Sequence, residues 1–521
     1  MLTFQLTPYA GASWQQIGGG YATADGASRV TPLAHPMIEH TAYTDDSRTL
    51  IVIRETMTGQ PPAVPGMHPV TSADFDRHAT QAPSWPGDFV LVLTTPHAPV
   101  QVTAGAARTT PLYLAADTER LYGSWEMADL RGHAGRLHAV EAARRLVFRP
   151  RYGTQTFFEG IHRLTERATA HYGGALHINY PEPALHHDPR ELAPDADVLG
   201  VFTELLRDAL DAHPWGPATT VFHLSGGFDS GCIATTAAAR RPGAVRTAAL
   251  LIDGPGRAQQ ESRRAEIRSV LPFAPVDYLV DAAVNLPLDA RCARVRGELI
   301  SLYEEPLHYP FTLLTAQLAE AGATTLVTGL GGDELVALSE VEAPHLDLNR
   351  IAVPPAWLGG RARTLLEYGD VGAAPPAPIN SMTLLALETT APPLLREGIY
   401  PIHPFAYPPL VAFGEQLPYV WRDFKALQRH LLAGYGLSDH VVHPAERESF
   451  AEIVQHTLTG QGVQLLEAML RDGSVLFDED LVDPDALAAA TKRIRDGDYE
   501  ETVESKVFEV IHQHLALGAF L

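Results

Sequence analysis

Two serines, two glycines and an aspartate stand together at residues 225–230, in the order Ser-Gly-Gly-Phe-Asp-Ser. An apolar run precedes them and good helix formers follow, which predicts a buried strand, a tight turn and a helix. The N–H groups and positive dipole end of such a helix attract anions, and glycine lets a phosphate approach the backbone. The carboxylate of Asp229 would repel that phosphate unless a cation lay between them. The segment therefore predicts a pyrophosphate-binding loop with Mg²⁺, although an SGG triplet alone is also typical of a plain strand-turn-helix corner.

A second run of this kind lies further along the chain, at residues 323–335 (ATTLVTGLGGDEL). Its apolar, β-branched residues lead to glycines and then to Asp333 and Glu334, which predicts an acid pair at the carboxyl end of another strand. Open parallel sheets bind their ligands at those carboxyl ends. We therefore expect Asp229 and Asp333 to share one or two magnesium ions. Taken alone, a GGDE run is more often a turn that caps a helix.

The two motifs together resemble those of the asparagine synthetase family, in which an SGGxDS loop is followed by a TGxGGDEL motif. Further similarities lie at residues 261–265, 304–306, 400–405 and 425–429, so the resemblance covers most of residues 195–450. It implies an α/β fold of the ATP-pyrophosphatase type, with a parallel sheet and helices. It also implies that ATP is split between its α and β phosphates, so that AMP is left on an oxygen of the substrate. The residues that the resemblance places around ATP are Leu224, Ser225, Gly226, Gly227, Asp229, Ser230, Ile252, Thr328 and Gly329.

The N-terminal part resembles the glutaminase domain of the same family more loosely, at residues 86–89, 110–114, 123–126 and 156–161. Its alternating apolar and polar residues suit an antiparallel sheet sandwich, and the resemblance implies the Ntn-hydrolase type. A run rich in proline, aspartate and histidine, without an apolar period, follows this part and reads as a linker. We therefore predict a degenerate glutaminase-like domain at residues 1–180, a linker at 181–197 and an ATP-dependent synthetase domain at 198–521.

The residue that a working glutaminase of this family needs is missing. Such an enzyme uses an N-terminal cysteine, exposed by removal of Met1, with the terminal amine as base, and position 2 is Leu2. The two cysteines of the chain, Cys232 and Cys292, both lie in the second domain. We therefore expect that this domain does not release ammonia from glutamine. The attacking amine then belongs to the substrate itself, and an intramolecular amine would close a lactam.

Two branches of the family close lactams and lack the cysteine: beta-lactam synthetases, which act on a small amino acid derivative, and lasso peptide cyclases. The small-molecule enzymes have a tyrosine in a TGYG motif, where this chain has Leu330, and a lysine in an RPKxG-like segment, where residues 443–450 contain none. Arg447 or Lys425 would then supply the positive charge that stabilises the leaving pyrophosphate. These departures favour a lasso peptide cyclase, which adenylates an Asp or Glu side chain of a core peptide and joins it to the peptide's N-terminal amine.

The attacking amine must lose a proton, and residues 303–309 hold two candidates to take it. Glu305 stands in the stretch that resembles the family's DEP motif, and it could act as the base or as a counter-ion for the substrate amine. His308 is the second candidate, because an imidazole suits proton transfer near neutrality. The chain has 23 histidines, however, so any one of them is more often a surface or core residue than a catalytic one.

Other interpretations stay open on the sequence alone. An ammonia-dependent asparagine synthetase and a small-molecule lactam or amide ligase would use the same two motifs. A catalytically inactive scaffold is disfavoured, because both acid motifs are intact. The expected cofactors are ATP and Mg²⁺, and the expected partner is a precursor (core) peptide. Whether a leader peptidase and a leader-binding protein take part is open.

The composition limits the partners further. The formal net charge is −23, which argues against an exposed nucleic-acid surface. The sequence has no apolar run of about eighteen residues, as a membrane helix would need. The first 28 residues hold no lysine or arginine, so no secretory signal is indicated and we expect a cytoplasmic protein.

Overall fold

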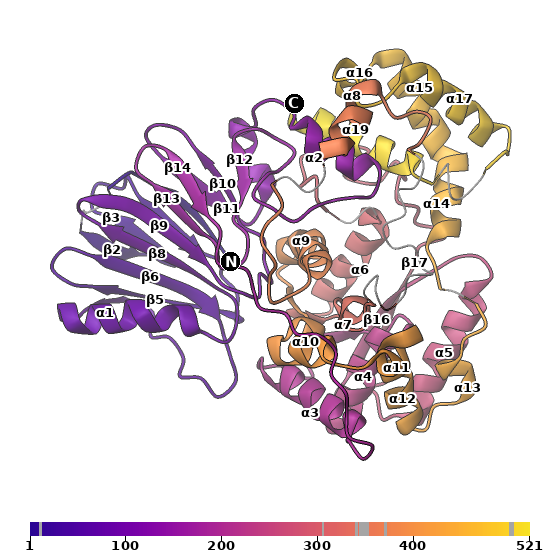
Figure 1. Cartoon of the computed structure of the whole chain (residues 1–521), viewed down its shortest axis with the longest axis horizontal. Helices are drawn as coiled ribbons and strands as arrows, with labels where there is room; N and C mark the ends of the chain where they lie inside the picture. Colours follow the sequence, from indigo (N-terminus) through magenta and orange to yellow (C-terminus); the bar gives the residue numbers. More distant parts are fainter. Residues whose placement is uncertain are drawn as a thin grey trace.

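The computed structural model describes residues 1–9, 13–304, 307–338, 342, 354–368, 372–446, 448–499 and 505–521. Figure 1 shows two parts side by side: a stack of strands from the first third of the chain and a larger, mostly helical part from the rest. The predicted fold class, an antiparallel sandwich followed by a parallel sheet with helices, is confirmed.

Within the described residues, the N-terminal strands form two sheets of seven strands each, in the orders β12-β10-β11-β1-β4-β3-β2 and β14-β13-β9-β8-β6-β5-β7. Neighbouring strands are antiparallel, except that β7 runs parallel to β5. Side chains on β1 alternate between buried and partly exposed, because a strand that packs on one face turns every second residue into the core. The strands are β1 (Leu2–Leu6), β2 (Trp14–Ile17), β3 (Gly20–Thr23), β4 (Arg29–Pro32), β5 (Ile38–Thr44), β6 (Thr49–Glu55), β7 (Met67–Pro69), β8 (Phe89–Thr95), β9 (Ala98–Ala104), β10 (Tyr113–Ala116), β11 (Leu121–Ser124), β12 (Ile161–Arg163), β13 (Thr169–Tyr172) and β14 (Leu176–Asn179).

The C-terminal part is built on a parallel sheet with the strand order β17-β16-β15-β18-β19. Its strands are β15 (Thr220–His223), β16 (Arg246–Leu251), β17 (Asp277–Asp281), β18 (Thr325–Val327) and β19 (Tyr400–Ile402). Each neighbouring pair is parallel. Val221 and Phe222 of the central strand are fully buried, as expected for a parallel sheet that is covered on both faces. Strands β15 and β18 are adjacent, so the two predicted motifs leave the sheet side by side.

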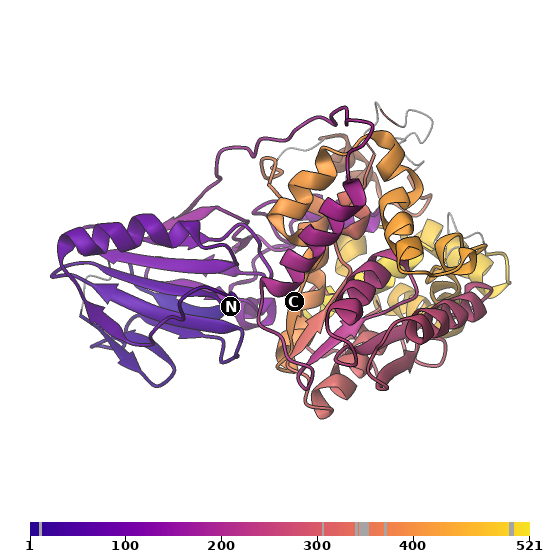
Figure 2. The same ribbon diagram turned by 90° about the horizontal axis from the view of Figure 1, so that it is seen from below.

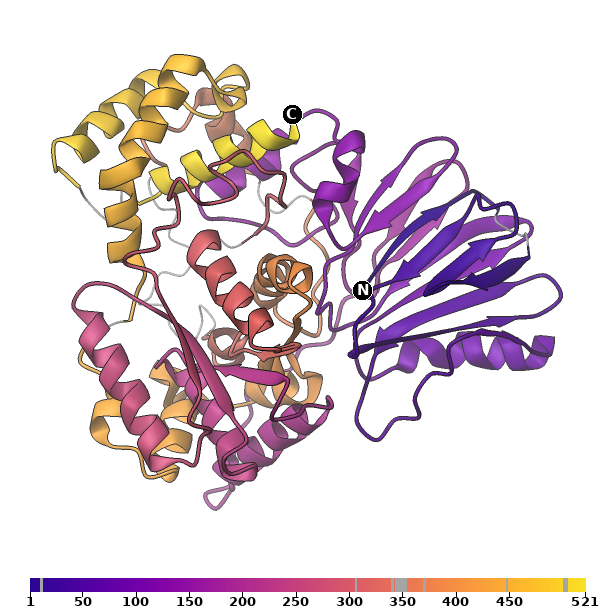
Figure 3. The ribbon, with the colours of Figure 1, turned by 180° about the vertical axis from the view of Figure 1, so that it is seen from behind.

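Helices surround this sheet and form a separate cluster near the C-terminus. Helices α3, α4 and α12 pack against one another, whereas α6 packs on β16 and β17 and contacts α9 (Figure 3). The helices are α1 (Ser72–Gln81), α2 (Ala139–Leu146), α3 (Val198–Asp211), α4 (Phe228–Arg240), α5 (Gly256–Val270), α6 (His308–Glu320), α7 (Gly332–Leu335), α8 (Gly360–Leu365), α9 (Ser381–Arg396), α10 (Pro408–Glu415), α11 (Tyr419–Arg422), α12 (Ala426–Gly434), α13 (Asp439–Val442), α14 (Ala451–Thr457), α15 (Val463–Asp472), α16 (Val475–Asp478), α17 (Pro484–Arg495) and α19 (Val507–Phe520). Among the described residues, no helix combines the length and the apolar character that crossing a membrane requires.

The segment between the two parts, residues 181–197, has neither helix nor strand. Figure 2 shows it as an extended trace that passes from the sandwich to α3. Backbone hydrogen bonds tie it to the second part: the N–H of Ala184 donates to the carbonyl of Pro376 (2.7 Å), and the N–H of Arg190 donates to that of Gln416 (3.1 Å).

A buried polar contact joins the sandwich to α9. Nε of Arg163 donates to Oε1 of Glu388 at 2.8 Å, and the hydroxyl of Tyr113 donates to the same oxygen at 2.5 Å. The side chains of Arg163 and Glu388 are both only 4% exposed. The two parts therefore share a desolvated ion pair, and they also share the packing of α2 against α8 and α19.

Candidate active site

The first motif forms a tight loop between β15 and α4. Gly226 has a φ of 100°, in the left-handed region that glycine adopts without a steric penalty. The N–H of Ser225 donates to Oγ of Ser230 at 3.0 Å, the two serine hydroxyls lie 2.9 Å apart, and the N–H of Gly227 donates to Oγ of Ser225 at 3.2 Å. The N-cap residue of α4 is Gly227, which has no side chain to cap the helix. The first turn of α4 therefore offers its N–H groups to a ligand.

The second motif approaches the first so closely that only glycine fits at two positions. A Cβ placed on Gly329 would lie 2.6 Å from the backbone nitrogen of Ser230. A Cβ placed on Gly332 would lie 2.5 Å from Oδ1 of Asp229. Real Cβ atoms do not come that close to other heavy atoms, so the glycines of the second motif allow Asp229 and Asp333 to reach the same space.

Lys425 lies between these two aspartates. Its Nζ is 2.6 Å from Oδ2 of Asp229 and 2.6 Å from Oδ1 of Asp333. Phe424 and Lys425 both have positive φ, 45° and 56°, a conformation that costs a side-chain-bearing residue free energy and that aims Lys425 back at the loops. Burial raises the pKa of Asp229 to about 6, although the Lys425 ammonium beside it favours the carboxylate form.

The two aspartates fit a magnesium ion that arrives with a nucleotide. In the part of the chain that the structure describes, no group of three or more His, Cys, Asp or Glu side chains is placed to hold a metal ion. Magnesium in nucleotide sites is commonly bound through one or two carboxylates together with phosphate oxygens. Asp229 and Asp333 supply carboxylates of that kind beside the phosphate-binding loop.

A cavity of about 880 Å³ opens over the two loops. The predicted site residues that line it are Ser225, Gly227, Asp229, Ile252, Asp333 and Lys425. Leu224, Gly226, Ser230, Thr328 and Gly329 belong to the same two loops but do not line it. Leu307, Phe311, Leu330 and Phe450 are among the apolar residues that also line it. The cavity thus combines a polar, phosphate-sized cradle with an apolar wall, as is typical of small-molecule sites.

Thr328 does not line this cavity, and its hydroxyl lies 2.7 Å from Nδ1 of His403. Burial lowers the pKa of His403 to about 3, so its imidazole is neutral at physiological pH. The geometry indicates that Thr328 fixes the end of β18 against β19.

His308 lies in a buried ion cluster and does not line the cavity. Its Nδ1 is 3.0 Å from Oε2 of Glu304, and Nη2 of Arg396 donates to the same oxygen at 2.6 Å. Burial opposes ionisation of Glu304, but His308 and Arg396 outweigh it and lower the pKa of this carboxyl to about 2. Glu305, the other candidate base, lies outside the described residues.

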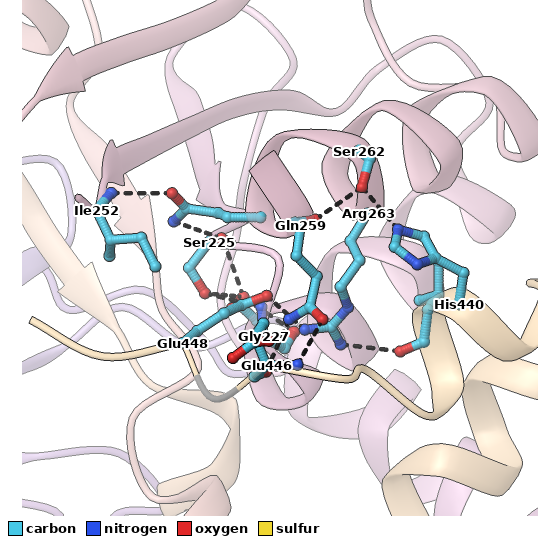
Figure 4. A network of polar contacts seen from close by, with 12 residues as sticks. Ser225, Gly227, Ile252, Gln259, Ser262, Arg263, His440, Glu446 and Glu448 are labelled. Atoms are coloured by element: carbon cyan, nitrogen blue, oxygen red, sulfur yellow. Dashed lines mark hydrogen bonds and ion pairs between the residues drawn. The ribbon is translucent and has the colours of Figure 1, made fainter. Parts of the chain in front are cut away.

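Several polar residues at the glycine loop were not predicted from the sequence (Figure 4). Gln260 on α5 joins two strand ends, because its Oε1 accepts from the N–H of Ile252 (2.9 Å) and its Nε2 donates to the carbonyl of Ser225 (2.9 Å). Arg263, one turn further along α5, pairs with Glu448 at 2.5 Å. The neighbouring Arg447 was predicted to stabilise the leaving pyrophosphate with its positive charge, and it lies outside the described residues.

The segment that carries Glu448 is held on α5 by its backbone. Nε2 of Gln259 donates to the carbonyl of Glu446, and the N–H of Glu446 donates to Oε1 of Gln259, both at 2.8 Å. The partners are 187 residues apart in the sequence. No local spacing could therefore have revealed these contacts.

The parallel sheet, the glycine loop at its central strand and the acid–lysine cluster together define a nucleotide-dependent enzyme of the α/β class. The sequence profile of the asparagine synthase family matches residues 201–514, and the chain belongs to this family. Its members are ATP-dependent carbon–nitrogen ligases, generally with Mg²⁺. A search of curated proteins found no match to the chain.

Proposed function

We propose that the chain is an ATP-dependent, AMP-forming macrolactam synthetase of the lasso peptide cyclase type. It adenylates the side-chain carboxylate of an Asp or Glu in a core peptide and joins that carbonyl to the peptide's N-terminal amine. Membership of the asparagine synthase family supports the general reaction, which is carbon–nitrogen ligation driven by ATP. The finer assignment rests on the cavity and on the N-terminal domain.

The observation that carries the proposal is the lining of the cavity. Leu330 lies in its wall, where the small-molecule lactam synthetases have a tyrosine, and a leucine cannot accept a proton from an amine. Phe311 and Phe450 extend the apolar surface around it. A volume of about 880 Å³ is near the upper end of the range for ligand sites, which suits ATP together with a peptide side chain.

The N-terminal domain supports an internal amine as the nucleophile. The side chain of Leu2, at the position of the glutaminase cysteine, is fully buried in the core of the sandwich. Both cysteines of the chain, Cys232 and Cys292, are buried in the C-terminal part. We propose that this domain is structural and that it braces α9 through the Arg163–Glu388 pair.

In the first step, an oxygen of the substrate carboxylate attacks the α phosphorus of ATP, and the bond to the bridging oxygen of pyrophosphate breaks. The glycine loop and the first turn of α4 bind phosphate oxygens through their N–H groups. Lys425, which pairs with Asp229 beside this loop, supplies positive charge to the phosphate oxygens. Mg²⁺ held by Asp229 and Asp333 would add positive charge that neutralises the pyrophosphate as it leaves.

In the second step, the N-terminal amine attacks the activated carbonyl, AMP leaves with the bonding electrons, and the amine loses one proton. The base proposed for that proton is Glu305. The structure puts His308 in the Glu304 cluster, so we propose that His308 positions this segment beside the cavity instead. Leu307 and Phe311 give the cavity an apolar wall, and exclusion of water there would protect the adenylate from hydrolysis.

Substrate-dependent release of pyrophosphate tests the proposal. Purified protein is incubated with ATP, Mg²⁺ and leader-free peptides that have a free N-terminal amine and an internal Asp or Glu. Parallel reactions contain aspartate with ammonium, or small carboxylic acids that carry an amine. Peptide-dependent release supports the proposal, and acetylation of the peptide's amine should then leave adenylation intact and stop the ring closure. Turnover with a small acid or with aspartate and ammonium would favour the corresponding alternative.

A further inference from the structure

An acidic side chain occupies the space next to the glycine loop. Oε1 of Glu448 lies 3.3 Å from the point where a Cβ on Gly226 would be, and Oε2 lies 3.8 Å from the corresponding point on Gly227. Figure 4 shows Glu448 between this loop and Arg263. A carboxylate therefore stands beside N–H groups that suit a phosphate.

Arg263 is a buried cation at the edge of the same cavity. Its side chain is only 2% exposed, and it lines the cavity together with Glu448. Nη1 pairs with Glu448 at 2.5 Å and Nη2 donates to the carbonyl of Val441 at 2.9 Å. Nε has no hydrogen-bond partner among the described residues. A buried guanidinium with an unused donor beside an anion loop has capacity for a further anionic oxygen.

A second arginine lies near the same loop. The guanidinium carbons of Arg263 and Arg429 each lie 4.9 Å from the centre of the Phe228 ring, at the start of α4. Both arginines line the cavity. Two cations therefore flank the first turn of α4, and the carboxylate of Glu448 is the ion-pair partner of Arg263 among the residues that the structure describes.

We propose that Arg263 binds the β and γ phosphates of ATP, and that Glu448 is its resting counter-ion, which the triphosphate displaces. The proposal rests on the ATP site of the proposed function and adds a phosphate-binding residue to it. When ATP enters, its phosphate oxygens replace the Glu448 carboxylate both at the glycine loop and on Arg263. Arg263 remains paired before and after the exchange, so no buried charge is left alone.

The backbone around Glu448 suits such an exchange. Gln259 holds the backbone of Glu446 by two hydrogen bonds, so the segment can stay on α5 while the Glu448 side chain turns away. The Glu448 side chain is 15% exposed, which gives it a path to solvent. A triphosphate or pyrophosphate must therefore compete with the Glu448 carboxylate for Arg263 and the glycine loop. AMP has no β or γ phosphate and binds without this competition.

The test compares Glu448→Gln with Glu446→Gln by calorimetric titration of the full chain with MgATP, magnesium pyrophosphate and AMP. Glu446 is an exposed residue of the same segment and also borders the cavity, so the comparison separates the loss of a nearby negative charge from the loss of the pair with Arg263. We expect Glu448→Gln to lower the Kd for ATP and for pyrophosphate about fivefold, which corresponds to about 1 kcal/mol of binding free energy. The Kd for AMP should change by less than about twofold. Glu446→Gln should change each Kd by less than about twofold.

The Arg263 variants separate binding from folding. Arg263→Gln should raise the Kd for ATP by about tenfold or more, and Arg263→Lys should raise it less. In the Arg263→Gln background, the additional Glu448→Gln change should have little further effect on this Kd. Equal melting temperatures would show that the variants are folded. The inference is overturned if wild-type protein binds ATP but Glu448→Gln weakens or does not change that binding, or tightens AMP as strongly as ATP. Wild-type protein that binds neither ATP nor pyrophosphate would overturn the proposed function as well.

Discussion

Nζ of Lys425 lies 2.6 Å from Oδ2 of Asp229, although the two residues are 196 positions apart in the sequence. Asp229 lies in the first turn of α4, just after the glycine loop, and Lys425 directly precedes α12. The contact joins the phosphate loop, the second acidic motif through Asp333, and α12 at one point. Each of these elements therefore depends on the others for its place in the site.

Replacing Lys425 by methionine should abolish adenylation without unfolding the protein. The Lys425→Met variant removes the positive charge beside the two carboxylates and leaves Asp229 and Asp333 facing each other. We expect kcat/KM for pyrophosphate release to fall by about 10² or more, because a partly buried charge that acts in the transition state contributes several kcal/mol. Lys492→Met is the control, because Lys492 is exposed on α17 and should keep full activity. Full activity of Lys425→Met would contradict this role.

Gly332→Ala should separate the two motif loops. The new methyl group would lie 2.5 Å from Oδ1 of Asp229, so either loop must shift. We expect a loss of about 2 kcal/mol or more in the free energy of unfolding and a marked fall in pyrophosphate release. Gly434→Ala adds the same methyl group at a place with no atom within 4 Å and should be neutral. If Gly332→Ala were equally neutral, the close approach of the loops would be in doubt.

The fold was largely predictable because its signals are local. Buried and partly exposed side chains alternate along β1, and β15 holds an apolar run. Each pattern can be recognised from a few neighbouring residues. The SGGFDS and GGDE motifs indicated loops at strand ends for the same reason, and β15 and β18 do lie next to each other. The chain thus specifies its layers and its anion loop through short patterns.

The remaining parts of the site depend on contacts between distant segments. Arg263 and Glu448 are 185 residues apart, and nothing in the spacing of either stretch indicates that they pair. His308 stands only four residues after Glu304, but Arg396 on α9, which pairs with the same carboxylate, comes from a distant part of the sequence. A sequence pattern can suggest which residues could do chemistry, but the tertiary packing decides which of them face the cavity.

Breaking the ion pair between the two parts of the molecule should destabilise it strongly. Arg163→Met leaves the Glu388 carboxylate buried without its cation, which we expect to cost about 3–5 kcal/mol in chemical denaturation. Arg163→Met combined with Glu388→Leu should recover much of that loss, because no unpaired charge remains. The exposed pair Arg136–Glu159 provides the control, and Arg136→Met should cost less than about 1 kcal/mol. A similar cost for both arginine variants would argue against a desolvated pair.

A buried histidine should make the protein less stable in mild acid. Burial, with Arg294 nearby, lowers the pKa of His512 to about 4 from its ordinary value of 6.5. Below pH 6.5 the unfolded chain binds a proton there that the folded chain does not, so stability present above this pH is lost as the pH falls toward 4. The contribution is about 2 kcal/mol at about pH 5. The neighbouring Glu509 has a pKa of about 2, and its effect begins only below 4.5.

Denaturation curves at several pH values check this. Between about pH 6.5 and about pH 5, the free energy of unfolding should fall less steeply in His512→Gln than in the wild type. The difference between the two slopes should correspond to the uptake of about one proton per molecule on unfolding. Parallel curves for the two proteins would show that His512 does not titrate in this way.

Ring closure is tested most directly by the mass of a peptide after incubation with this protein, ATP and Mg²⁺. We expect a leader-free peptide with a free N-terminal amine and an internal Asp or Glu to lose one water, while one AMP and one pyrophosphate form for each peptide. Unchanged mass across such peptides, together with AMP formation from a small amino acid derivative or from aspartate and ammonium, would contradict this expectation.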